Sequence, residues 1–193
     1  MRKSLIDSRS ILIAFIAAAL IGFTLLGYRY YADRNQGQAL IGGHFELIDQ
    51  DGKKVADNNF RGKYMLVFFG YTSCPDICPI TLQTISGALD ELGEKAKDIQ
   101  PIFISIDPLR DNVSILKDYI SHFHSRFIAL TGSKEEIEQA SKAYRVFYQS
   151  NQNTGLIDHS SVIYLMDKKG RYLQHFPADA NQSEIVKGLI PLS

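Results

Sequence analysis

The sequence predicts an α/β domain with parallel central strands, preceded by a helix that spans a membrane. Continuous apolar runs bounded by turn residues alternate with segments of helical periodicity, which indicates buried strands and helices in alternation. Strand, helix, strand order produces a parallel crossover. The membrane helix is predicted because residues 10–28 carry no charge, and about 20 apolar residues cross a bilayer as a helix.

The composition describes a folded chain without a global charge signal. The 193 residues include 21 basic and 21 acidic side chains, so the formal net charge is zero. Nucleic-acid-binding domains usually carry a basic patch and a high pI, so we expect no nucleic-acid partner. A hydrophobic fraction of 45% is that of a globular protein.

We divide the N-terminal region into a cytoplasmic segment at residues 1–9, a transmembrane anchor at residues 10–28 and a linker at residues 29–43. A cleavable signal peptide is the alternative, but its apolar region is about 7–15 residues long and ends at a small-residue cleavage site. Here tyrosines and arginines follow the span. The basic residues slightly favour a cytoplasmic N-terminus, and the segment before the span is too short for a mitochondrial transit peptide. We therefore expect a single-pass protein of a bacterial inner membrane, with residues 44–193 in the periplasm.

The domain begins with a predicted hairpin and two buried strands. Residues 45–49 and 53–55 flank a Gln-Asp-Gly turn, which indicates a hairpin. Residues 64–71, YMLVFFGY, form a continuous apolar run that is typical of a strand buried on both faces. A helix is predicted over residues 79–97 and a second buried strand over residues 99–106.

The remaining predicted elements follow in the order helix, strand, helix, hairpin and helix, over residues 112–123, 127–130, 133–147, 161–176 and 181–190. Ser133 and Glu136 form a capping box for the second of these helices, and we expect Asp111 to cap the first. This order of elements is that of a thioredoxin-like sandwich. Its functional loop lies at the carboxyl end of the first parallel strand.

Both cysteines of the chain lie in that loop, in the sequence GYTSCPDICPIT. The spacing of Cys74 and Cys78 differs from the C-x-x-C of thioredoxins and of zinc sites. A structural disulfide is one interpretation, but a bridge across so short a loop removes little entropy from the unfolded chain. We therefore favour reactive thiols, which can bond to each other or share a metal ion.

Cys78 precedes Pro79, and proline favours the first position of a helix. We therefore expect Cys78 to be the N-cap of the helix. The positive end of a helix stabilises a thiolate, which predicts a lowered pKa for Cys78.

A histidine near the cysteines would complete a copper site, because thiolates select Cu(I) and imidazole adds affinity for Cu(II). Among five histidines, His159 is the best placed. It precedes the predicted strand at residues 161–166, and in a thioredoxin-like sheet the loop before that strand approaches the functional loop. We favour His159 as a ligand over a purely structural histidine.

Three motifs then carry a resemblance to a known family. They are CPDICP at residues 74–79, IDPLRD at residues 106–111 and DHSSVIYLMD at residues 158–167. In this order, behind one N-terminal anchor, they make residues 40–190 resemble the Sco/SenC family of copper proteins, which assemble cytochrome c oxidase.

The resemblance implies a thioredoxin-like domain that binds one copper ion, as Cu(I) or Cu(II), through Cys74, Cys78 and His159. The two cysteines would also form a redox disulfide, and Asp107 would orient a ligand. The implied role is that of a metallochaperone rather than an enzyme. It would deliver copper or reducing equivalents to the dinuclear copper A centre of cytochrome c oxidase subunit II. Other copper chaperones or thioredoxin-like reductants would be further partners.

Two other functions remain open. One is a periplasmic thiol-disulfide oxidoreductase that acts on partner cysteines, and the other is a peroxidase of peroxiredoxin type. A peroxiredoxin would have a threonine three residues before its reactive cysteine, where Tyr71 stands. His159 distinguishes a copper protein from an oxidoreductase, because thiol exchange does not require an imidazole.

Overall fold

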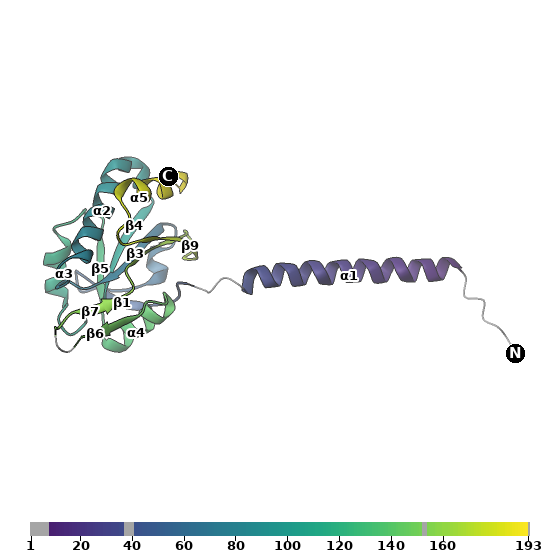
Figure 1. Cartoon of the computed structure of the whole chain (residues 1–193), viewed down its shortest axis with the longest axis horizontal. Coiled ribbons are helices and arrows are strands. Elements are labelled where there is room, and N and C mark those ends of the chain that lie inside the picture. The colour runs from purple at the N-terminus through teal and green to yellow at the C-terminus, as the bar shows by residue number, and fades with distance from the viewer. Residues whose placement is uncertain (1–7, 37–40, 152–153, 193) are drawn as a thin grey trace. The chain divides into compact units, whose positions relative to one another are not determined.

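The structure is a computed structural model of the chain, and it describes residues 8–36, 41–151 and 154–192 (Figure 1). Two compact units are present, Met1–Ala39 and Leu40–Ser193. Most of the predicted cytoplasmic segment, and part of the predicted linker, lie outside the described residues.

The first unit contains one described helix, α1, Ser8–Gln36. It covers the predicted span at residues 10–28 and continues into the predicted linker. The side chains of residues 8–10, 12–15 and 30–36 lie outside the described part of the chain. Among the residues that are described, no helix is both long and apolar enough to cross a membrane.

The second unit is built on a seven-stranded sheet of described residues, in the order β2-β1-β5-β4-β3-β8-β9. Its strands are β1 Glu46–Asp49, β2 Lys54–Ala56, β3 Tyr64–Gly70, β4 Ile99–Ser105, β5 Ile128–Thr131, β8 Val162–Met166 and β9 Tyr172–Pro177. β4 pairs in parallel with both β3 and β5, which confirms the predicted crossover. β1 and β8 join the parallel strands in antiparallel pairing. The sheet is therefore parallel at its centre and antiparallel at both margins.

Among the described residues of this unit, four α-helices pack around the sheet: α2 Ile77–Leu92, α3 Val113–Ile120, α4 Lys134–Ala143 and α5 Gln182–Leu189. α2 packs against α5, α3 against β5 and α4 against β1. β3 and β4 are buried almost throughout, as predicted for parallel strands covered on both faces. The predicted capping box of α4 is also confirmed, because Ser133 and Glu136 bond to each other's backbone N–H.

The boundaries of α2 differ from the prediction. Asp76, rather than Cys78, is the N-cap, and Cys78 lies in the first turn. Proline is tolerated throughout the first turn, because the amide hydrogens there have no partner within the helix, so Pro79 did not fix the first residue. The helix ends at Leu92 because Gly93 adopts a φ of 53°, a left-handed value that favours glycine.

Two further features were not predicted. α3 is capped by Asn112, whose side chain accepts from the Ile115 N–H, so the predicted cap at Asp111 was wrong. A second sheet pairs β6, Tyr148–Ser150, with β7, Ile157–His159, in an antiparallel hairpin. Strands of three residues are too short to produce a recognisable alternation of polar and apolar residues.

Candidate metal centre

The cysteine loop connects β3 to α2, at the carboxyl end of the parallel strands where α/β sheets bind ligands. Cys74 and Cys78 are both free thiols. Their exposed fractions are 8% and 0%. Cys74 lies in the loop before α2, and Cys78 lies in the first turn of α2, so both predicted sulfur ligands stand at this end of the sheet.

His159 also reaches this place, from the end of β7. Its Nε2 lies 3.8 Å from the Sγ of Cys78, although 81 residues separate them in the chain. Its Nδ1 lies 3.1 Å from the carbonyl oxygen of Ser160. A carbonyl only accepts, so Nδ1 carries the proton and Nε2 presents its lone pair toward the sulfur. The other four histidines contact groups elsewhere: Asp57 for His44, the Tyr119 carbonyl for His122, Asp90 for His124 and Tyr172 for His175.

The electrostatics of this pair favour neutral groups. Burial raises the pKa of the Cys78 thiol, and Cys74 raises it further. The lowered pKa predicted for Cys78 was therefore wrong, because desolvation outweighs the positive end of α2. Burial also lowers the pKa of His159. A metal cation that replaces the thiol proton would offset the unfavourable free energy of burying the thiolate charge.

Cys74, Cys78 and His159 are not arranged as a complete metal centre in this structure. Among the described residues, no group of three or more His, Cys, Asp or Glu side chains is placed so that it could hold a metal ion. Cys78 contacts His159, whereas Cys74 stands in the loop before α2. A centre with all three ligands therefore requires the loop around Cys74 to rearrange.

Aromatic rings position His159. The imidazole lies 6.0 Å from the ring of Tyr71 and 6.3 Å from that of Phe68, both in edge-on orientation. The hydroxyl of Tyr71 accepts a hydrogen bond from the Ile157 N–H at 3.3 Å. Tyr71 thus connects the end of β3 to the hairpin that carries His159.

Asp111 anchors the start of the cysteine loop. Its fully buried carboxylate accepts from the N–H and the hydroxyl of Thr72 at 2.9 and 2.6 Å. It also accepts from the hydroxyl of Ser105 at 2.6 Å. These bonds tie the loop to the end of β4. The sequence did not reveal this role, because an Asp before a helix is usually a cap.

Asp107 lies at the end of β4 as predicted, but its described side-chain contact is an ion pair with Arg110. The guanidinium of Arg110 lies 5.8 Å from the ring centre of Tyr71. Tyr71 in turn contacts His159. Asp107 is thus linked to the predicted ligands through two other side chains rather than by contact.

A glycine at the end of β3 gives Cys78 its space. A Cβ added at Gly70 would lie 2.8 Å from the Sγ of Cys78 and 2.9 Å from Cε2 of Phe103. Both distances are shorter than van der Waals contact. Only glycine therefore lets the sulfur lie against the strand.

Comparisons with known proteins agree with these features. The SCO1/SenC family model matches residues 33–192. A SCO2-like protein of Rickettsia prowazekii is 44% identical over 152 residues, which cover 76% of this chain and 74% of that protein. The structure of Arabidopsis thaliana ScoI with copper bound has a TM-score of 0.74 and 39% identity, over 78% of this chain and 96% of that one. Bradyrhizobium japonicum ScoI with copper bound gives 0.72 and 40%, over 78% and 98%. These matches confirm the predicted fold and family resemblance.

Proposed function

The chain belongs to the SCO1/SenC family, and from this premise we propose that it binds one copper ion through Cys74, Cys78 and His159. We further propose that it delivers this copper to the dinuclear copper A centre of cytochrome c oxidase subunit II. The observation that carries the proposal is the 3.8 Å approach of Cys78 Sγ to His159 Nε2. It brings the sulfur of the buried Cys78 and an imidazole nitrogen of the half-buried His159 close together.

The donor set suits copper in both oxidation states. Two thiolates satisfy Cu(I), and the imidazole supplies the nitrogen that Cu(II) favours. The Ser160 carbonyl fixes the orientation and tautomer of the His159 ring, as the outer partners of metal-binding histidines generally do. The copper is cargo in this proposal, so its ligands must also release it. Cys74, which lies in a loop, is the ligand best able to move.

A thiol-disulfide oxidoreductase is the second candidate. In that reaction Cys74 and Cys78 would form a disulfide, and the two electrons and two protons would pass to a partner disulfide. The raised pKa of Cys78 argues against it as the main role, because the thiolate is the nucleophile in exchange. Cys74 would have to attack first. Keeping the partner's copper-binding cysteines reduced is the form of this activity that fits the family.

We also propose that residues 10–28 anchor the protein in a bacterial inner membrane, with the domain in the periplasm. The support is the uncharged stretch of sequence. If the anchor is correct, the chain stays in the membrane fraction after alkaline carbonate extraction, and its mass includes α1. A mature chain that begins near Asp33 would contradict it.

Copper transfer tests the proposed function. The chain, loaded with one equivalent of Cu(I), is mixed with the apo copper A domain of subunit II. We expect that domain to acquire copper and the donor to lose it. A donor that binds no copper, yet reduces a disulfide in that domain rapidly, would favour the oxidoreductase instead.

A further inference from the structure

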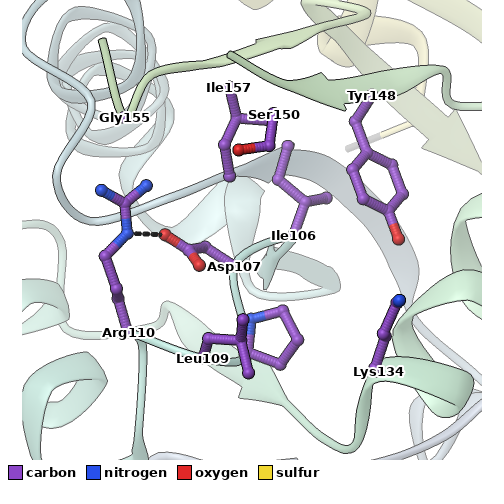
Figure 2. A pocket seen from close by; sticks show the side chains of 10 residues that line it. Ile106, Asp107, Leu109, Arg110, Lys134, Tyr148, Ser150, Gly155 and Ile157 are labelled. Atoms are coloured by element: carbon purple, nitrogen blue, oxygen red, sulfur yellow. Dashed lines mark hydrogen bonds and ion pairs between the residues drawn. The ribbon is translucent and has the colours of Figure 1, made fainter. Parts of the chain in front are cut away.

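A cavity of about 420 Å³ opens between the end of β4, the start of α4 and the hairpin β6–β7. Its size is that of a site for a small ligand or an inserted side chain. Ile106, Leu109 and Ile157 supply apolar surface, and Arg110 and Lys134 lie on opposite sides of it (Figure 2).

The cavity combines exposed apolar surface with two positively charged side chains, Arg110 and Lys134. Leu109, which lines the cavity, is 91% exposed. Phe147 and Leu156, which directly precede β6 and β7, are exposed as well. An apolar patch with a polar rim is typical of an interaction site. Lys134 has no ion-pair partner among the described residues, and Arg110 binds Asp107 through Nε alone. The charge and the apolar surface together fit an apolar side chain with carboxylates on either side.

The same hairpin lines the cavity and carries the candidate ligand. Tyr148 and Ile157 contribute to the wall, and Tyr148 pairs in register with His159. Ile157 also donates its N–H to Tyr71, which packs on the His159 ring. A group that fills the cavity would therefore contact the element that positions His159.

We propose that this cavity is the docking site for the copper acceptor of the proposed function, the copper A domain of subunit II. A peptide segment of that partner inserts an apolar side chain against Leu109 and Ile157, and its flanking carboxylates bind Lys134 and Arg110. Docking holds the partner's ligands next to the cysteine loop and restrains the hairpin that carries His159. The identity of the partner rests on the proposed function, whereas the site rests on the cavity itself.

The test uses two variants of the full chain, each with a matched control. Lys134→Glu reverses one rim charge, and because residue 134 opens α4, a glutamate there is favourable for the helix. Lys142→Glu makes the same charge change near the other end of α4, where the lysine side chain is 82% exposed. Leu109→Ser removes the exposed apolar group, and Leu173→Ser does so on β9, outside the cavity lining.

Binding of the Cu(I)-loaded chain to the apo copper A domain is measured by calorimetry, and copper transfer by stopped-flow absorbance. We expect Lys134→Glu and Leu109→Ser to weaken binding by about tenfold or more, which is about 1.4 kcal/mol. Their Cu(I) affinity should stay unchanged, and both controls should bind like wild type. Added salt should weaken the wild-type complex.

The outcomes separate this proposal from the proposed function. Equal binding by all five proteins, or no binding by wild type, would overturn the docking site, even if copper is transferred. Binding that the two cavity variants lose, without copper transfer by wild type, would support docking and overturn delivery. A cavity that binds free succinate but not the copper A domain would be a small-molecule site, and the proposal would be wrong.

Discussion

Replacing Asp111 with alanine should destabilise the domain and loosen the cysteine loop. The buried carboxylate accepts three hydrogen bonds, two from Thr72 and one from Ser105. Hydrogen bonds to a charged group contribute about 1.5–3 kcal/mol each, but the two hydroxyls can turn to other acceptors, so we expect a loss of about 3–4 kcal/mol. Asp111→Asn keeps one carbonyl oxygen as an acceptor and should cost only about 1–2 kcal/mol.

The assay is urea denaturation of residues 40–193, with Cu(I) affinity measured in parallel. Asp111→Ala should weaken Cu(I) binding, because the loop that carries Cys74 loses its anchor. Asn112→Ala is the control, since it removes the N-cap of α3 and should cost about 1 kcal/mol without changing copper affinity. If Asp111→Ala costs no more than Asn112→Ala, Asp111 does not anchor the loop.

Three further changes test other contacts. Either Cys74→Ser or Cys78→Ser should abolish tight Cu(I) binding, since one thiolate and one imidazole form a poorer soft site. A Cu(I) affinity within about tenfold of wild type in either variant would exclude an ion shared by both cysteines. Tyr119→Phe should raise the free energy of unfolding by about 1 kcal/mol in urea denaturation, because the buried Tyr119 hydroxyl has no hydrogen-bond partner among the described residues. A lower free energy of unfolding in this variant would show that the Tyr119 hydroxyl has a hydrogen-bond partner. Gly70→Ala should lower stability by about 1–3 kcal/mol and weaken Cu(I) binding, because its Cβ would contact Cys78 and Phe103; unchanged affinity would show that Cys78 can shift freely.

The sequence was most informative where one local signal decided the structure. The apolar run at residues 64–71 specified a buried central strand, and Ser133 with Glu136 specified the start of α4. The fold also predicted correctly that His159 approaches Cys78, whereas no contact joins it to Cys74 among the described residues. These features depend on neighbouring residues or on topology alone.

The sequence was least informative where burial decided the chemistry. Cys78 lies in the first turn of a helix, a position that lowers a thiol pKa in water, yet complete burial raises it. Asp111 has the spacing of a cap, but its side chain turns inward to Thr72. Asp107 pairs with Arg110, which no local pattern indicated. Such outcomes depend on which residues the tertiary fold desolvates.

The pH dependence of apo stability gives independent evidence on His159. Its lowered pKa means that the unfolded chain takes up a proton near pH 6.5 while the folded chain does so only at lower pH. Stability should therefore fall as the pH decreases below about 6.5, and His159→Ala should lose that part of the slope in urea denaturation at several pH values. An identical slope in the variant would contradict a half-buried imidazole with a lowered pKa.

The central claim is that Cys78 and His159 share one copper ion, and competition titration with Cu(I) and Cu(II) chelators tests it most directly. Cu(I) is satisfied by two thiolates, whereas Cu(II) prefers additional nitrogen donors. His159→Ala should therefore leave Cu(I) affinity within about tenfold of wild type and weaken Cu(II) binding far more. If the variant binds Cu(II) as tightly as wild type does, His159 is a structural histidine and the copper ligand lies elsewhere.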